Sequence, residues 1–213
     1  MTCIVGFTDK KNNVTWMGGN SLGSNGYTQT VNLAGKVFHN DILSNVVIGG
    51  TSTFRHLDLL KYSKNLFPEV DKYKLEKGEI TIDHKYMVTS FIPNVIALFQ
   101  SGVVSEVDKD RGGNFLIGIN GSLFEVQPDY SVLEPQDNYS VVGCGELCAK
   151  GSLYTTTKYM KDNLTPKEHI LYALEAAEKT MCGVKRPFVI INSKGEKKLL
   201  SKVQNYDELF RFL

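Results

Sequence analysis

The chain alternates between short apolar runs of β-forming residues and longer stretches with helical spacing. Apolar runs of this kind that flank short polar turns predict β-hairpins. The strongest turn signal is Asn120-Gly121, because both residues tolerate the left-handed backbone of a two-residue hairpin turn. A further strand is expected at 139–142. The four predicted hairpins pair 2–8 with 14–19, 37–38 with 46–48, 115–119 with 123–126, and 187–191 with 198–200.

Helical spacing predicts two helices in the first half of the chain. The first begins with Ser52 or Thr53 as its N-cap. The second begins after Asp83, and Pro93 is expected to kink it. The charged segment 69–82 between them is expected to form a loop. The apolar faces are expected to hold Phe54, Leu57, Leu59 and Leu60 in the first helix and Met87, Phe91, Val95, Leu98 and Phe99 in the second.

Two more helices are predicted in the second half. One follows the turn 143–145 and runs towards Lys161. The other begins at Thr165-Pro166-Lys167-Glu168, which combines a capping box with proline at the first helical position. The apolar residues expected to face the core are Leu147, Leu153 and Tyr154 in the first of these helices and Ile170, Ala173, Leu174 and Ala177 in the second.

Hairpins alternating with helix pairs indicate the fold class. Neighbouring strands joined by short turns must be antiparallel, so a parallel βαβ fold is disfavoured. The pattern therefore predicts an α+β protein in which antiparallel sheets are covered by helix layers. At 213 residues, with no linker or repeat, we expect a single domain over 1–213.

Composition excludes several classes of function. The 24 basic and 23 acidic side chains give a net charge of +1 and are mixed along the sequence, so nucleic acid is not an expected partner. No basic segment followed by an apolar run opens the chain, and no stretch approaches the roughly 20 apolar residues of a membrane span. We expect no membrane association and a cytoplasmic location.

The cysteines favour free thiols over disulfides or a metal site. Cys3, Cys144, Cys148 and Cys182 lack the dense paired spacing of a disulfide scaffold. Cys144 and Cys148 could form half of a zinc site, but the four histidines are scattered and no second ligand pair is present. We expect neither a metal nor a cofactor.

The start of the chain carries the most suggestive chemistry. Removal of Met1 would give Thr2 both a hydroxyl nucleophile and an α-amino group, whose ordinary pKa of about 7.7 to 8.0 suits a general base. One residue could then supply both functions. A threonine after the initiator methionine is common, however, so Thr2 alone favours a structural role, and only its order with Lys36 and Gly49 favours a catalytic one.

The landmarks of the sequence resemble the proteasome β-subunit family of N-terminal nucleophile (Ntn) hydrolases, which includes a bacterial two-component peptidase. The family's N-terminal threonine falls on Thr2, its lysine on Lys36 in Ala34-Gly35-Lys36-Val37-Phe38, and its oxyanion-hole glycine on Gly49. Its glycine-serine-glycine element falls on 143–145. The resemblance covers nearly the whole chain. It implies a four-layer αββα sandwich, rings of subunits, threonine peptidase activity on polypeptides and a possible unfoldase partner.

Three departures from the family pattern bear on activity. Asn20 stands where the bacterial relatives have the aspartate that orients and neutralises the lysine, and Cys144 replaces the serine of the glycine-serine-glycine element. The aspartate and serine that follow the penultimate helix have no clear counterpart in 180–184. Without a carboxylate, burial should lower the pKa of Lys36, and a neutral Lys36 could act as a base.

Other interpretations of these residues stay open. Lys36 could be a solvated charge at a strand end, Gly49 part of an ordinary turn, and Cys144 a small buried residue. Cys3 would be the terminal nucleophile only if Met1 and Thr2 were both removed. At the level of function, the alternatives to a peptidase are an amidase acting on small molecules and a catalytically silent structural or assembly protein with the same fold.

Overall fold

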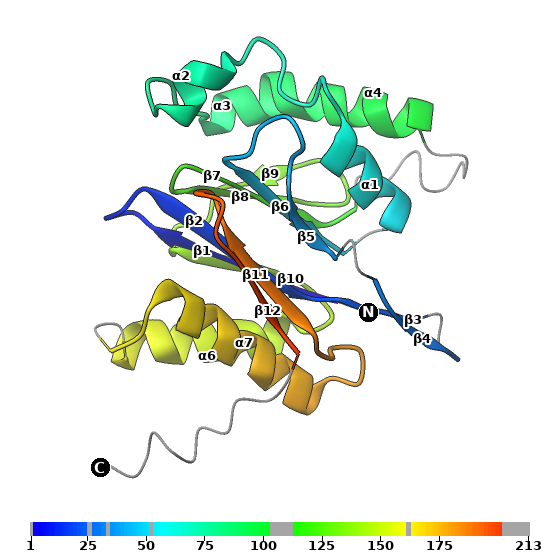
Figure 1. Ribbon diagram of the computed structural model, residues 1–213, viewed down its shortest axis with the longest axis vertical. Coiled ribbons are helices and arrows are strands. Elements are labelled where there is room, and N and C mark those ends of the chain that lie inside the picture. The colour runs from blue at the N-terminus through cyan, green and yellow to red at the C-terminus, as the bar shows by residue number, and fades with distance from the viewer. Residues whose placement is uncertain are drawn as a thin grey trace.

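Four layers of secondary structure build the molecule (Figure 1). The computed structural model describes residues 2–24, 27–32, 35–51, 53–102, 113–160 and 163–201. Two five-stranded antiparallel sheets lie in the middle, with one group of helices above and a helix pair below. This confirms the predicted α+β sandwich with helix layers outside two antiparallel sheets.

The first sheet holds the start of the chain between two other strands. Its strands run in the order β10-β1-β2-β11-β12, so β1 lies between two partners and its backbone is held on both sides. Both predicted hairpins of this sheet are confirmed, because β1 pairs with β2 and β11 pairs with β12. The strands are β1 (Cys3–Asp9), β2 (Val14–Asn20), β10 (Tyr139–Gly143), β11 (Phe188–Asn192) and β12 (Lys197–Leu200).

The second sheet has the order β5-β6-β7-β8-β9. Its two predicted hairpins are also confirmed. Asn120 and Gly121 have φ values of 44° and 81°, the left-handed geometry that a two-residue turn between β7 and β8 requires. The strands are β5 (Val37–His39), β6 (Val46–Gly50), β7 (Phe115–Ile119), β8 (Ser122–Val126) and the unpredicted β9 (Val132–Leu133).

The helices above the second sheet agree in part with the helices predicted from the sequence. In α1 (Phe54–Tyr62), Thr53 is the N-cap and accepts a hydrogen bond from the His56 amide, while the alternative cap Ser52 lies outside the described residues. Phe54 is 42% exposed, so its assignment to the apolar face was wrong. The expected loop 69–82 contains the short helix α2 (Lys72–Glu76), which forms because Asp71 caps it and Leu75 is fully buried.

The second predicted helix is interrupted before its proline. Asp83 caps α3 (His84–Tyr86), as expected, and the chain continues through the π-helical segment η1 (Met87–Phe91) into α4 (Ile92–Gly102). Pro93 has no N–H to donate, and a wider π-type turn accommodates that missing hydrogen bond. The π-helical segment ends two residues before Pro93, and the kink expected at Pro93 stays a prediction.

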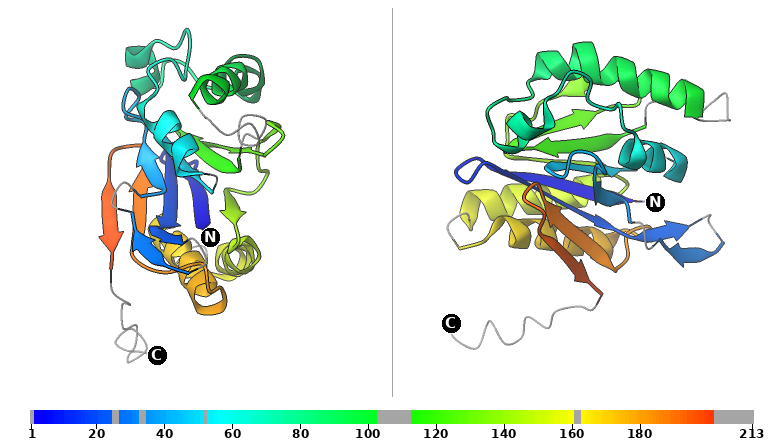
Figure 2. Two further views of the ribbon diagram at one scale, coloured as in Figure 1. Left: turned by 90° about the vertical axis from the view of Figure 1, so that its right-hand side faces the viewer. Right: turned by 45° about the horizontal axis from the view of Figure 1, so that its top comes forward.

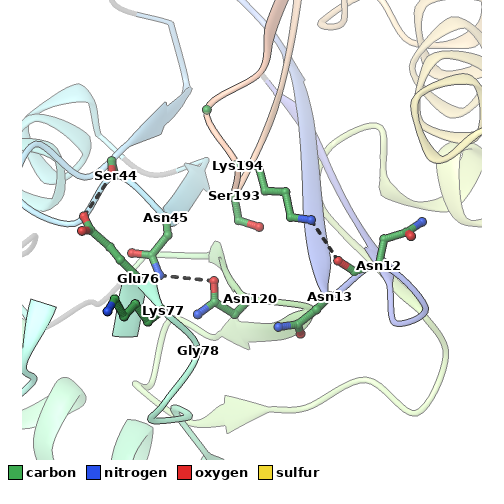
Figure 3. A pocket seen from close by; sticks show the side chains of 11 residues that line it. Asn12, Asn13, Ser44, Asn45, Glu76, Lys77, Gly78, Asn120, Ser193 and Lys194 are labelled. Carbon is green, nitrogen blue, oxygen red and sulfur yellow. Dashed lines mark hydrogen bonds between the residues drawn. The ribbon is translucent and has the colours of Figure 1, made fainter. Parts of the chain in front are cut away.

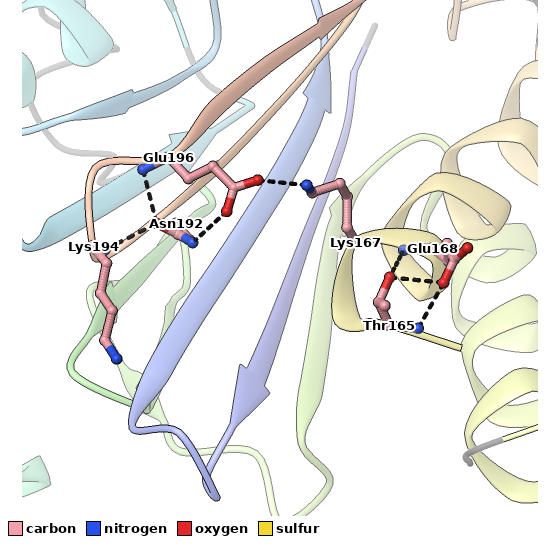
Figure 4. A network of polar contacts seen from close by, with 6 residues as sticks. All are labelled: Thr165, Lys167, Glu168, Asn192, Lys194 and Glu196. Atoms are coloured by element: carbon pink, nitrogen blue, oxygen red, sulfur yellow. Dashed lines mark hydrogen bonds and ion pairs between the residues drawn. The ribbon is translucent and has the colours of Figure 1, made fainter. Parts of the chain in front are cut away.

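Two helices cover the outer face of the first sheet. In α7 (Pro166–Thr180), the predicted capping box is present: Thr165 and Glu168 exchange side-chain and backbone hydrogen bonds (Figure 4). In α6 (Glu146–Tyr159), Leu153 is buried as expected, but Leu147 and Tyr154 are 84% and 54% exposed. Their assignment to the core was wrong, because three apolar residues did not define which face of α6 packs inward.

A small hairpin that the sequence pattern did not predict projects from the end of the sandwich (Figure 2). Its strands β3 (Leu22–Ser24) and β4 (Gln29–Val31) are three residues long and, within the described residues, pair only with each other. β3 follows β2 almost directly and so leads from the first sheet towards the segment before β5. In the described ranges, no helix is long and apolar enough to cross a membrane.

Candidate active site

Thr2 lies at the entrance to β1 and is held there by the turn that follows β10. Cys3, the first residue of β1, pairs with Gly143 at the end of β10. The Thr2 carbonyl accepts a hydrogen bond from the Gly145 amide at 3.4 Å, and the Thr2 nitrogen donates to Cys144 Sγ at 3.3 Å. Only 5% of Thr2 is exposed. The hydrogen bonds of its backbone nitrogen and carbonyl oxygen therefore fix the position of Thr2.

Lys36 brings its amine directly to the Thr2 hydroxyl. Lys36 Nζ lies 2.8 Å from Thr2 Oγ1 and donates a second hydrogen bond to the Leu22 carbonyl at 2.5 Å. The lysine sits between Gly35, whose φ of 71° turns the chain, and the first residue of β5. It is only 4% exposed, so the expectation of a solvated strand-end charge was wrong.

Burial lowers the pKa of Lys36 from its ordinary value to about 8, and the charge of Cys144 acts in the opposite direction. An amine with this pKa is about one tenth neutral at pH 7. A neutral amine at hydrogen-bond distance from a hydroxyl has a lone pair that can accept the hydroxyl proton. The geometry thus places the Thr2 hydroxyl in direct contact with an amine of lowered pKa.

Asn20 holds the start of β1 through a buried hydrogen bond. It is the last residue of β2 and is fully buried. Its Oδ1 accepts a hydrogen bond from the Cys3 amide at 2.9 Å, whereas its Nδ2 has no hydrogen-bond partner among the described residues. Because an amide carries no charge, Asn20 fixes the backbone beside Thr2 without supplying a counter-charge to the site.

Gly49 lies at a point of close contact between the two sheets. It pairs with Val37 and Leu116 inside β6, and a Cβ at this position would come within 2.6 Å of Ile4 and 2.7 Å of the Met17 sulfur. Absence of a side chain is therefore required for packing, and Gly49 is part of a strand rather than a turn. Its assignment as the oxyanion donor stays a prediction.

The turn after β10 places Cys144 against the amino end of Thr2. Gly143 has a φ of 108°, and a Cβ there would lie 2.2 Å from the Thr2 carbonyl oxygen, so only glycine fits. Cys144 is exposed, which corrects the interpretation of it as a small buried residue. Cys144 directly precedes Gly145, which is the N-cap of α6.

Thr2 thus contacts both Lys36 and Cys144, and the structure adds one atom that sequence reasoning missed. This atom is the Leu22 carbonyl oxygen, which fixes the direction of the lysine side chain. No side-chain pattern could have identified it, because every residue carries a carbonyl group. Within the described part of the chain, no cluster of three or more histidine, cysteine or acidic residues could hold a metal ion.

A polar cavity of about 400 Å³ lies at the other end of the sandwich (Figure 3). Hairpin turns line it, including Asn12 and Asn13 between β1 and β2, and Asn120 between β7 and β8. Thr2 stands before the first residue of β1, whereas Asn12 follows its last residue. The cavity is therefore separate from the contact between Thr2 and Lys36.

Comparison with known proteins shows which solved structures have a similar fold. No protein-family model matches the chain, and no curated protein matches it by sequence. Among solved structures, BPH (bacterial proteasome homologue) from Thiobacillus denitrificans in complex with epoxomicin is 13% identical, with a TM-score of 0.63 over 95% of this chain and 100% of that chain. A second structure of the same BPH is 16% identical, with a TM-score of 0.65 over the same shares.

HslV from Trypanosoma brucei is similar to a comparable degree. It is 14% identical to this chain, with a TM-score of 0.60 over 89% of this chain and 98% of that chain. BPH and HslV are proteasome-β-like Ntn hydrolases. At these identities the likeness establishes the fold, and the predicted resemblance in architecture is confirmed.

Proposed function

We propose that this chain, which has the proteasome-β-like Ntn-hydrolase fold, is an N-terminal threonine hydrolase that cleaves amide bonds, most simply as a peptidase. The observation that carries the proposal is the 2.8 Å contact between Thr2 Oγ1 and Lys36 Nζ in a buried position. Removal of Met1 is part of the proposal, because it frees the α-amine of Thr2.

In the proposed reaction, Thr2 Oγ attacks the carbonyl carbon of the scissile amide while its proton passes to neutral Lys36. The tetrahedral intermediate collapses, the C–N bond breaks, and the leaving amine takes up a proton. Water then attacks the Thr2 ester, releasing the carboxylic acid and restoring the hydroxyl. The freed α-amine of Thr2 is available to accept the proton of that water.

The developing oxyanion needs a hydrogen-bond donor near Thr2. We assign this role to the Gly49 backbone N–H, as the resemblance implies, since β6 ends close to the segment that carries Lys36. Gly49 itself is paired within the sheet, with Val37 and Leu116, and the neighbouring Gly50 amide donates to the Lys36 carbonyl at 3.1 Å. Loss of an oxyanion donor typically costs about 10²- to 10³-fold in rate.

A second candidate function is a catalytically silent assembly protein. Asn20 favours it, because the site has an amide where the related bacterial enzymes have a carboxylate, and its Nδ2 is buried without a partner in the described structure. In this alternative, the contacts around Thr2 serve only to close the end of the sandwich. Replacement of Thr2 by alanine would then change neither assembly nor biological function.

Self-association into rings or stacked oligomers is part of the leading proposal. Leu147 and Tyr154 stand seven residues apart on α6, which places them near the same face of the helix, and both are exposed. Exposed apolar groups on a helix are suited to contact with a second copy. A polypeptide or a small amide as substrate, an unfoldase partner and a cytoplasmic location complete the proposal.

The test compares turnover with covalent capture. Protein expressed without an N-terminal tag would be assayed against a library of fluorogenic peptides and treated with an electrophile that acylates N-terminal threonine. The proposal expects a mass increase on Thr2 in the wild type and in Thr2→Ser, and none in Thr2→Ala. It fails if protein with free Thr2 shows neither turnover nor modification, and an assembly role for the chain would then be favoured.

A further inference from the structure

We propose that a cavity between β8, β10 and α6 binds an alkylguanidinium group, with the carboxylate of Glu125 as its counter-charge. The cavity has a volume of about 570 Å³, which is within the range of ordinary small-molecule sites. It lies at one edge of the sandwich, because β10 ends the strand order of the first sheet and β8 and β9 end that of the second. The site is independent of the activity proposed for Thr2.

Glu125 occupies a position where the neighbouring side chains are apolar. It lies two residues after Leu123 in β8, so both side chains are on the same face of that strand. Ser140 and Val142 share a face of β10 in the same way. Leu123 and Val142 belong to an apolar cluster formed by both sheets, and Glu125 and Ser140 continue it with polar groups. Only 7% of Glu125 is exposed, so its carboxylate is largely removed from water.

Both oxygens of this carboxylate accept hydrogen bonds from neutral donors. Ser140 Oγ donates to Oε2 at 2.5 Å, and Gln127 Nε2 donates to Oε1 at 3.2 Å. In the described part of the chain, no lysine or arginine forms an ion pair with Glu125. Removal of a carboxylate from water is costly unless an opposite charge compensates it. A bound cation can supply that charge.

The lysines on α6 beside the cavity have other partners. Lys150 lines the cavity but forms an ion pair with Glu146 at 2.7 Å. Lys158 donates to the Tyr154 hydroxyl at 2.9 Å. Asp137, which is exposed, adds a second carboxylate to the lining. The lining thus carries two carboxylates and one lysine, a balance that favours a cationic ligand.

The remaining acceptor positions suit a guanidinium group better than an ammonium group. Each oxygen of Glu125 accepts one hydrogen bond, and each has a second lone pair. A guanidinium group is planar and can donate two parallel hydrogen bonds to a carboxylate, whereas an ammonium group has no such fork. Tyr139 and Tyr154 offer aromatic rings to the guanidinium plane, and Leu133 and Pro135 offer apolar contact to an alkyl stem.

The first test measures the binding of butylguanidinium to the full chain by isothermal titration calorimetry. Butylurea, which has the same stem and a planar head without charge, is the control ligand. We expect the wild type to bind butylguanidinium at least about tenfold more tightly than butylurea. Glu125→Gln should remove this preference. Asp137→Asn, which removes the same charge at an exposed position of the same cavity, should keep it.

The second test identifies the source of the guanidinium group, which is either a free small molecule or an arginine side chain of a second copy of this chain. If a second copy supplies it, the wild type resists butylguanidinium, and light scattering gives a smaller mass for Glu125→Gln than for Asp137→Asn. If a free molecule supplies it, these masses are equal and the wild type prefers butylguanidinium.

Three results overturn the proposal. One is a wild type that binds the two ligands equally while the masses of Glu125→Gln and Asp137→Asn are also equal. The others are a preference that persists in Glu125→Gln and a preference that Asp137→Asn abolishes to the same extent. The comparison of ligands on the wild type does not depend on the folding of a variant. Because neither test involves turnover, failure here is distinguishable from failure of the proposed function.

Discussion

The stability of the fold should rise with pH because of Lys36. Its folded-state pKa is about 8, whereas an unfolded lysine titrates near 10.4. Between these values the unfolded chain keeps a proton that the folded chain has released, so the unfolding free energy increases as the pH rises. The slope approaches 1.36 kcal/mol per pH unit, which gives a rise of about 2 kcal/mol between pH 7.5 and 9.5.

Urea denaturation of the wild type and Lys36→Met at a series of pH values measures this contribution. The groups common to both proteins cancel in the difference between their unfolding free energies. Removal of the two Lys36 hydrogen bonds changes the level of that difference more than its slope. Lys197→Met, at an exposed position, is the matched control and should give a flat difference. A difference for Lys36→Met that is flat, or that falls with pH, would refute the argument.

Three further predictions concern other parts of the fold. Gly143→Ala should lower the unfolding free energy, measured by urea denaturation, by about 2 to 4 kcal/mol, because its φ is 108° and the added Cβ would overlap the Thr2 carbonyl. The control Gly195→Ala, at a φ of 90° with open space around it, should lower it by only about 1 kcal/mol. Thr165→Ala should remove the capping box of α7 and cost about 1 kcal/mol, measured against Thr155→Ala on α6; equal effects would contradict this. For the proposed oligomer, Leu147→Glu should lower the mass measured by light scattering, whereas Tyr73→Glu on α2 should not; an unchanged mass in Leu147→Glu would exclude this face of α6 as a contact.

Local sequence signals were sufficient where one short motif determines the geometry. The turn at Asn120-Gly121 and the capping box at Thr165 were both predicted, because each depends on the backbone preferences of a few neighbouring residues. The order of hairpins and helix pairs then indicated the layered architecture. No long-range information was needed to reach the fold class.

The sequence predictions were wrong where tertiary packing determines which side chains are buried. Leu147 and Tyr154 are apolar but exposed, and only the position of α6 on the first sheet determines which side of the helix is covered. Leu75 shows the opposite case, since a short helix forms in a charged segment around one buried side chain. In both places tertiary contacts outweighed the local pattern.

The sequence identified candidate site residues but could not show which of them contact one another. Thr2 and Lys36 were identified through family resemblance, and their 2.8 Å contact across 34 residues required the fold. The contact of Cys144 with the Thr2 nitrogen spans 142 residues; the family resemblance placed Cys144 in the glycine-serine-glycine element but did not give this contact. Sequence reasoning did identify burial as the cause of the lowered Lys36 pKa, because it recognised that Asn20 carries no charge.

The central claim is that Thr2, once exposed, is a nucleophile activated by Lys36. Intact-mass spectrometry of untagged protein, before and after treatment with an electrophile that captures N-terminal threonine, tests it most directly. The account predicts loss of Met1 and addition of one electrophile per chain in the wild type, with the addition slowed at least about 10²-fold in Lys36→Met. Chains that lose Met1 but add no electrophile, or that react equally fast without Lys36, would contradict it.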